Sequence, residues 1–318
     1  MFLADFKYIV FWWLTINLFA ISFLPLTFSI FPKFFDRGYI FSKILSLSIV
    51  TYIIFCLSIV KLLPFTNTSI IGVLIFINLI NYYSLFIKNK WKEFVKIFKS
   101  IFKFILLEEL LFFTLLVLWS VVRSYAPDIE GLEKYMDWGF INSAMRAEFL
   151  PPADMWYAGQ SINYYYFGHL IFALLTKISS IPSSITYNLS IATLCGLVFT
   201  SGFSLVANLA KNNKSFLLAG LFSALLLTFG GNLHPIYKIL KINYLANNNH
   251  FDLNISAIQK AAESYWYPDA TRFIGFDPDI NNKTIHEFPL YSFLKLTRNG
   301  LIIPWDAKLN SNGDIVFK

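Results

Sequence analysis

The sequence predicts an all-α protein that crosses a membrane several times, and three observations support this prediction. Of the 318 residues, 56% are hydrophobic and 14% are charged, and the mean hydropathy is +0.57. A soluble domain of this length does not carry so apolar a composition. Several stretches also reach the roughly 20 apolar residues that a membrane-spanning helix needs. A helix satisfies its own backbone N–H and C=O groups, which hydrocarbon cannot do.

The apolar stretches predict about six to seven spans. The six clearest are residues 8–31, 40–63, 69–87, 104–122, 185–210 and 215–232, and a weaker candidate is 165–180. The first contains Pro25, which membrane helices tolerate because neighbouring groups satisfy the freed carbonyl. Cys56 and Cys195 both fall inside apolar stretches, so no disulfide framework is indicated.

The net charge of +7 reflects membrane orientation and gives no reason to expect a nucleic-acid partner. Residues 88–103, "KNKWKEFVKIFKSIFK", hold six lysines against one acid, with apolar residues at helical spacing. This pattern predicts a cytoplasmic interfacial helix. Its lysines would either recognise anionic lipid or, as we favour, only set the orientation of the chain. We expect a multi-pass protein of the plasma membrane, with the lipid bilayer as its partner.

The orientation of the first four spans follows from this basic segment. With residues 88–103 inside, the span 104–122 carries residues 123–164 to the outer face. Six acids and three bases occur in 123–164, as an outer loop allows.

The segment 165–180 decides the orientation of everything after it. If it crosses fully, Lys211 and Lys214 lie outside and the polar stretch 233–290 lies inside. If it dips into the membrane and returns, both assignments reverse. The segment is short and ends in "SSIPSS", so length and the charge rule favour the dip.

Residues 132–149 of the outer loop predict an amphipathic helix along the membrane surface. One turn apart on its apolar face lie Leu132, Met136, Phe140 and Ala144. Glu133 and Asp137 share another face. Two such carboxylates can hold a divalent cation or act as a general base. The alternative, which spacing alone favours, is a solvated face where Lys134 pairs with Asp137 for roughly 0.2–0.5 kcal/mol.

Aromatic residues follow this helix. Pro151 and Pro152 end it, and the next residues supply Trp156 and then the run Tyr164, Tyr165 and Tyr166. Tyrosine and tryptophan suit the headgroup level, so an aromatic belt is the simpler interpretation. Three consecutive helical residues point about 100° apart, however, so at least one tyrosine must face the protein.

A second polar region, residues 264–294, carries Arg272 and Glu287. Arginine suits phosphate because its planar fork donates two parallel hydrogen bonds. The acids Asp277 and Asp279 of "DPD" fit a turn better than a metal motif. The four histidines of the chain lack ligand spacing, so we expect no zinc site.

Two stretches resemble a known family. Residues 133–172, "EKYMDWGFINSAMRAEFLPPADMWYAGQSINYYYFGHLI", resemble the signature of the uncharacterised membrane proteins of archaea and Chloroflexi that are named for their YYY motif. "TRFIG" (271–275) and "TIHEFPLYSFL" (284–294) resemble the second signature of that family. The family is itself similar to the type C glycosyltransferases, which are polytopic enzymes that use a polyprenyl-phosphate-linked sugar.

The resemblance implies a site and its ligands. Type C enzymes keep an essential acid in the first large outer loop, and Asp137 takes that position, with Glu133 secondary and Lys134 beside them. Arg272 takes the place of an arginine in the second signature. The remaining residues implied in binding the donor are Arg146, Trp156, Tyr164, Tyr165, Tyr166 and Glu287. A divalent cation such as Mg²⁺ or Mn²⁺ is the implied cofactor.

After Leu294 the resemblance ends. The family continues with an Asp-Leu-His-Pro-His element and many further spans, whereas here "KLTRNGLIIPWDAKLNSNGDIVFK" follows. We therefore expect the N-terminal part of a longer protein, or a truncated and inactive one. Its expected parts are residues 1–103 with the first spans, 104–294 with the family-like region, and a divergent tail, 295–318.

The rival interpretation is a membrane scaffold or a transport component. A buried acid within a span would favour transport, and Glu108 and Glu109 are candidates. Both are close to Lys103, so we expect them to snorkel to the interface.

Overall fold

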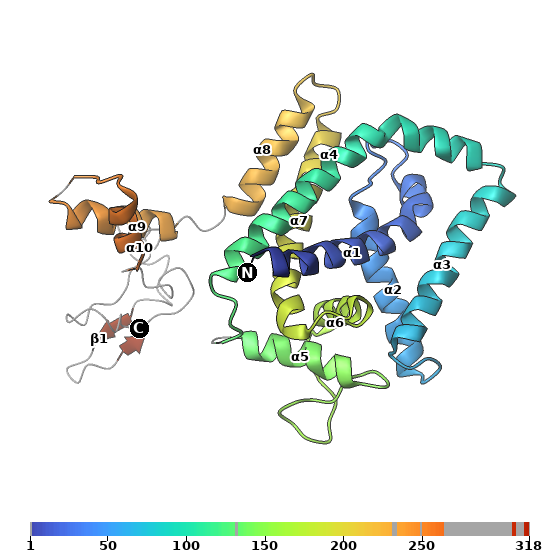
Figure 1. Cartoon of the computed structure of the whole chain (residues 1–318), viewed down its shortest axis with the longest axis horizontal. Coiled ribbons are helices and arrows are strands. Elements are labelled where there is room, and N and C mark those ends of the chain that lie inside the picture. Colours follow the sequence, from blue (N-terminus) through green and yellow to red (C-terminus); the bar gives the residue numbers. More distant parts are fainter. Residues whose placement is uncertain are drawn as a thin grey trace. The chain divides into compact units, whose positions relative to one another are not determined.

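The computed structural model describes residues 2–130, 133–230, 234–248, 250–263, 307–309 and 315–317. The expectations for Arg272, Glu287 and Leu132 lie outside these residues. The chain forms two compact units, Met1–Phe229 and Gly230–Lys318. The helices of the first unit are α1 (Phe2–Ile30), α2 (Phe41–Ile59), α3 (Asn67–Ile87), α4 (Trp91–Ser124), α5 (Lys134–Arg146), α6 (Phe167–Ser179), α7 (Ser183–Leu209) and α8 (Phe216–Phe229) (Figure 1).

The described residues of the second unit form two helices and a pair of short strands. They are α9 (His234–Ala246), α10 (Ile255–Glu263), β1 (Ala307–Leu309) and β2 (Ile315–Phe317). The strands are antiparallel. The Asn243 side chain links α9 to the chain before α10, because it donates to the Asp252 carbonyl (2.9 Å) and accepts from the Asp252 N–H (3.0 Å). The described chain is mainly helical, which confirms the all-α expectation. The two three-residue strands are an exception.

Among the described residues, five helices are long and apolar enough to cross a membrane. They are Phe6–Ile30 of α1, together with α2, α3, α4 and α7. The apolar helices α6 and α8 have 13 and 14 residues. They reach only about 20 Å, against about 30 Å of hydrocarbon. Helix length thus gives five spans among the described residues, where the sequence predicted six to seven.

The basic segment and the fourth span form one helix. The prediction of one helix over 88–103 and another over 104–122 is wrong, because α4 runs without interruption for 34 residues. No proline or glycine lies within it to break the backbone hydrogen bonds, and apolar residues from Phe94 to Phe112 pack on the bundle along both of its parts. The helix curves (Figure 1) and is about 50 Å long, so its basic end extends beyond the hydrocarbon. All six lysines of 88–103 are exposed, as an interfacial segment requires.

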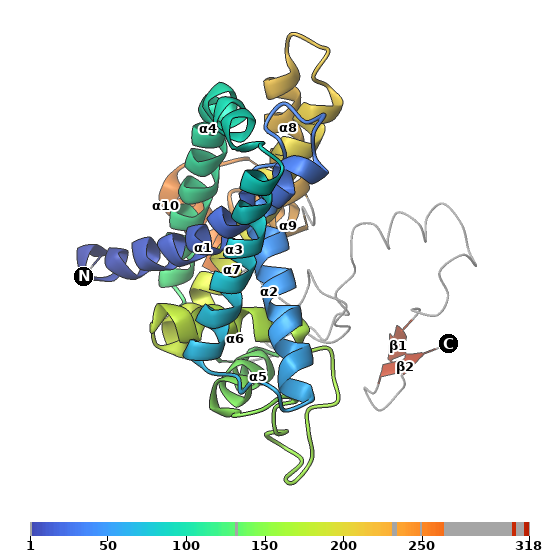
Figure 2. The same ribbon diagram turned by 90° about the vertical axis from the view of Figure 1, so that its right-hand side faces the viewer.

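The short helix α6 does not cross the bundle. Near its start, His169 contacts Asp137 of α5, and near its end the Lys177 ammonium donates to the carbonyl of Met145, also in α5 (2.8 Å). The Asn67 amide at the start of α3 donates to the Lys177 carbonyl (3.1 Å). Because both ends of α6 contact α5, the two helices lie together at one end of the bundle, as both views show (Figures 1 and 2).

The turn after α7 lies at the other end. The Lys211 ammonium donates to the Lys33 carbonyl (2.7 Å), and the Phe35 N–H donates to the Asn208 side chain (2.8 Å). Lys211 therefore shares an end of the bundle with the basic turn between α1 and α2. This arrangement agrees with the dip of 165–180 that the charge rule favoured.

Close helix packing holds the first unit together. Trp12 of α1 is fully buried and donates its indole N–H to the Thr193 hydroxyl of α7 (2.8 Å). A Cβ on Gly196 would lie 3.0 Å from the Phe112 ring, and one on Gly220 would lie 2.7 Å from the Phe203 carbonyl. These glycines let α7 approach α4 and α8, as small residues do in membrane helices.

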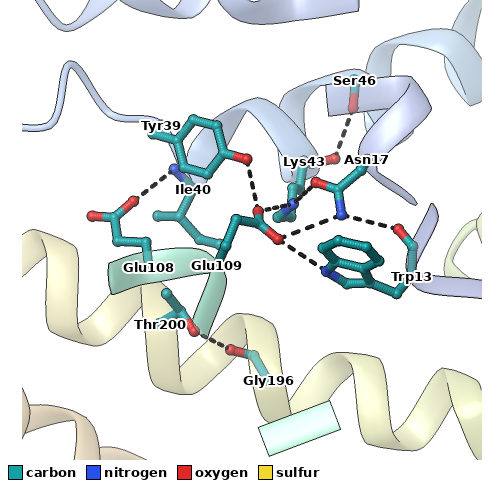
Figure 3. A network of polar contacts seen from close by, with 10 residues as sticks. All are labelled: Trp13, Asn17, Tyr39, Ile40, Lys43, Ser46, Glu108, Glu109, Gly196 and Thr200. Atoms are coloured by element: carbon teal, nitrogen blue, oxygen red, sulfur yellow. Dashed lines mark hydrogen bonds and ion pairs between the residues drawn. The ribbon is translucent and has the colours of Figure 1, made fainter. Parts of the chain in front are cut away.

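An ion pair lies inside the bundle. The Lys43 ammonium of α2 is 2.5 Å from Glu109 Oε1 of α4, and Lys43 is fully buried (Figure 3). The same carboxylate accepts hydrogen bonds from the Trp13 indole (2.9 Å) and the Tyr39 hydroxyl (2.7 Å). Glu109 therefore does not snorkel to the interface as the sequence suggested. It binds a cation on a neighbouring helix.

The orientation of the bundle can be tested by labelling single cysteines in a variant lacking Cys56 and Cys195. We expect an impermeant thiol reagent, applied to intact cells, to label Glu148→Cys and to leave Lys92→Cys unlabelled, because 88–103 carries the lysines. Both positions are exposed in the folded protein, so disruption of the cells should make them equally reactive. Labelling of Lys92→Cys alone in intact cells would reverse the orientation.

Candidate functional site

The packing of α5 on α6 brings Asp137 to His169. Asp137 Oδ1 lies 3.1 Å from His169 Nε2, and the side chains are 33% and 21% exposed. Lys134 instead donates to the Asp128 carbonyl (3.3 Å), so the predicted Lys134–Asp137 pair is not formed. Glu133 is exposed at the start of α5. The partner of Asp137 is therefore a histidine on another helix.

The apolar face of α5 is covered by protein. We expected this face to lie in lipid, with α5 resting on the membrane. Phe140 and Ala144 are buried, together with Ile141 and Ser143, and α5 packs on α6 and α7. The amphipathic pattern was correct, but the apolar partner is the helix bundle. Asp137 is consequently fixed in position by tertiary packing on both sides.

The surroundings of His169 are apolar on one side and polar on the other. Its ring meets Phe140 edge to face, with centroids 5.4 Å apart. Its Nδ1 is buried and has no hydrogen-bond partner among the described residues. The Asp137 carboxylate also interacts with the hydroxyl of Tyr187 on α7, which is buried. Asp137 of α5 thus meets one polar side chain from α6 and one from α7.

A cation lies beside this group. Arg123, in the last turn of α4, donates from Nε (3.0 Å) and one Nη (2.7 Å) to the Asn188 side-chain oxygen. The Asn188 amide in turn donates to the Pro127 carbonyl (2.9 Å). This network holds the guanidinium within electrostatic reach of Tyr187.

Tyr164 and Tyr165 form an exposed aromatic pair near the two acids. Their ring centroids are 3.8 Å apart and their hydroxyls are 2.5 Å apart. Tyr164 donates a hydrogen bond to Tyr165, and this bond, helped by the negative charges of Glu133 and Asp137, raises the pKa of Tyr164 to about 12. The Tyr164 ring also packs 5.8 Å from Phe140 of α5.

Tyr166 points the other way. It is half-buried, its ring lies 6.3 Å from that of Phe55 on α2, and burial raises its pKa. The expectation that one tyrosine faces the protein is therefore correct. The run itself is not helical, because α6 begins at Phe167.

The loop between α5 and α6 is a folded hairpin. Asp154 accepts the N–H groups of Trp156 (2.8 Å) and Tyr157 (2.9 Å), and Ala153 pairs with Ser161. Trp156 is 68% exposed. In the described part of the chain, no hydrogen bond or ion pair joins the side chain of Trp156 or of Arg146 to Asp137. Their expected role in binding a donor stays a prediction.

Metal ligands are not gathered at this site. Within the residues that the structure describes, no three His, Cys, Asp or Glu side chains form a cluster that could hold a metal ion. Asp137 and Glu133 would be the oxygen ligands for Mg²⁺ or Mn²⁺, but His169 already occupies one Asp137 oxygen.

Three residues of the site were missed by the sequence analysis: His169, Tyr187 and Arg123. His169 was regarded as one of four scattered histidines, although it follows the tyrosine run within "YYYFGHL". That proximity was the available signal. Tyr187 and Arg123 are joined to the site by packing across helices, and no pattern in the sequence indicates such packing.

Comparison with known proteins places the chain in a family. A family described as uncharacterized membrane protein (DUF2298) matches residues 49–295, a range that includes α5, α6 and the Asp137–His169 contact. Among curated proteins and among solved structures, nothing matches. Because the matched range spans well over half of the chain, this protein belongs to the DUF2298 family of uncharacterized membrane proteins.

Proposed function

We propose that this chain forms a membrane glycosyl-transfer site, which moves a sugar from a polyprenyl-phosphate donor to an extracytoplasmic acceptor with Asp137 as the general base. One observation carries the proposal. Asp137, the acid that the resemblance of 133–172 singles out, is held half-buried against His169.

The chemistry needs a base and a cation. Asp137 accepts the proton of the acceptor hydroxyl while that oxygen bonds to the anomeric carbon of the sugar. The bond from the anomeric carbon to the phosphate oxygen breaks, and polyprenyl phosphate leaves with the electron pair. His169, whose ring contacts Asp137, orients the carboxylate. Positive charge near the leaving phosphate stabilises the transition state, and Arg123 and Arg272 are the candidates.

Tyr164 and Tyr165 suit the entrance of such a site. Their stacked rings offer an apolar platform and their hydroxyls face the region of Glu133 and Asp137. A sugar has both apolar C–H faces and hydroxyl groups, and tyrosine meets both. Under this proposal, the phenol hydroxyls gathered at this place would bind the sugar of the donor.

A second candidate function is a transport component. Asp36 and Glu108 are fully buried among apolar helices, and acids in such positions mark ion or proton pathways in many membrane proteins. This candidate uses the other end of the bundle and does not need Asp137.

A transfer assay distinguishes the two. Membranes carrying the full-length natural protein would be incubated with a series of polyprenyl-phosphate sugars labelled in the sugar, and the label in the acceptor fraction would be measured. We expect transfer that depends on the donor and exceeds that of membranes without the protein. No transfer with any donor would leave the transport candidate.

Of the two candidate cations, Arg272 can serve the site only if it lies on the outer face. We expect residues 233–290 to share a face with 123–164, which requires the chain to cross the membrane again after Lys214, through α8 and the residues that follow it. An impermeant reagent on intact cells should then label Asn281→Cys but not Asn212→Cys. The neighbour of Asn212, Lys211, lies at the Lys33 end of the bundle. A reactive Asn212→Cys with a protected Asn281→Cys would exclude Arg272 from the outer site.

A further inference from the structure

Asp36, in the turn between α1 and α2, is hydrogen-bonded as an anion. Its Oδ1 accepts the Gly38 N–H (3.0 Å) and the Asn208 amide (3.0 Å), and its Oδ2 accepts the Ser204 hydroxyl. The side chain is fully buried. Three donors satisfy a buried carboxylate without a proton of its own.

Glu108 of α4 lies against Asp36, and one of its two oxygens has no hydrogen-bond donor among the described residues. Its Oε2 accepts the Ile40 N–H (3.2 Å; Figure 3), whereas no donor among the described residues reaches its fully buried Oε1. The Glu108 carboxyl interacts with that of Asp36, and the Ser204 hydroxyl that donates to Asp36 is also within reach of Glu108. Two ionised carboxylates only accept hydrogen bonds, so this contact needs a proton between them. Asp36 already receives three donors, which leaves Glu108 to carry the proton.

The neighbouring charges do not remove this need. Lys43 is bound to Glu109 and donates to Asn17 (2.5 Å), and the Tyr39 hydroxyl also donates to Glu109. In the described structure no lysine or arginine forms an ion pair with Asp36 or Glu108. Without the proton, the buried carboxylates of Asp36 and Glu108 would be two anions in contact. The nearby cation, Lys43, is paired with Glu109.

We propose that Asp36 and Glu108 form a proton-binding site inside the membrane bundle. The bound proton joins the turn between α1 and α2 to α4 through Glu108, and to α7 through Ser204 and Asn208. Its loss sets two anions in contact and weakens that junction. The site is independent of glycosyl transfer at Asp137.

The shared proton can be observed by infrared spectroscopy of the purified protein in lipid. At neutral pH we expect a C=O stretch of a protonated carboxylic acid that shifts in D₂O. Glu108→Gln should remove the band, because its amide can donate to Asp36 without a titratable proton. Glu93→Gln, an exposed position on the same helix, should keep it. Absence of the band in the wild type, or its survival in Glu108→Gln, would overturn the proposal.

The pH dependence of unfolding gives a second measurement. The folded protein holds a proton that the unfolded carboxyl, with a pKa near 4.3, releases at neutral pH. Folded protein thus binds one more proton, and the unfolding constant should rise about tenfold per pH unit from this group. Glu108→Gln should lose that component of the slope and Glu93→Gln should keep it. Equal slopes in the wild type and Glu108→Gln would overturn the proposal.

Discussion

Asp137→Asn is expected to lower donor-dependent sugar transfer by 10²–10⁴-fold, which is about 3–5 kcal/mol of transition-state stabilisation. Asparagine keeps the size of the side chain but cannot accept the proton of the acceptor hydroxyl. The Asp137–His169 contact is partly exposed, so its loss should cost less than about 1 kcal/mol of stability. Transfer in membranes and the amount of inserted protein would be measured together.

Two matched variants locate the effect. Asp128→Asn removes an exposed carboxylate from the same outer segment and should leave transfer unchanged. Glu133→Gln should cause a much smaller loss than Asp137→Asn. If wild-type membranes transfer sugar and Asp137→Asn membranes do so at the same rate, Asp137 is not the base.

Lys43→Met is expected to destabilise the protein by about 3–5 kcal/mol, because it removes one partner of a buried ion pair. Glu109 would keep its charge in an apolar bundle without the ammonium that lies 2.5 Å away. The change would also remove the cation from above the Phe112 ring, whose centroid lies 5.1 Å from it. Unfolding by SDS in mixed micelles measures the loss.

The matched controls separate pairing from packing. Lys103→Met changes an exposed lysine and should alter stability by less than about 0.5 kcal/mol. The double variant Lys43→Met with Glu109→Gln leaves no unpaired charge and should be more stable than Lys43→Met alone. If Lys43→Met unfolds at the same SDS concentration as the wild type, the Lys43–Glu109 pair contributes nothing to the stability of the bundle.

Sequence periodicity was sufficient to place most helices, but it divided α4 wrongly. The change from basic to apolar composition near Lys103 was interpreted as a boundary between two helices. Composition determines where a helix sits relative to the membrane, whereas ending it requires a residue that breaks the backbone hydrogen bonds. Residues 88–122 contain no glycine or proline, and this absence was the more reliable signal.

The site was predictable only in part for a related reason. Asp137 and the tyrosine run lie in one recognisable stretch, so the sequence pointed to them directly. The partner of Glu109 is Lys43, 66 positions earlier, whereas the nearby Lys103 suggested snorkelling. Spacing along one helix identifies neighbours on that helix. Contacts between helices depend on packing, which a single sequence does not contain.

The continuity of α4 also determines where homologous chains can differ in length. One residue inserted between Phe104 and Leu107 would rotate the rest of the helix by about 100°. Glu108 and Glu109 would then turn away from the side chains that now meet them. An insertion at Gly159, at an exposed position in the hairpin between α5 and α6, leaves every helix in register. We therefore expect relatives to gain and lose residues at the hairpin and to keep the length of α4 unchanged.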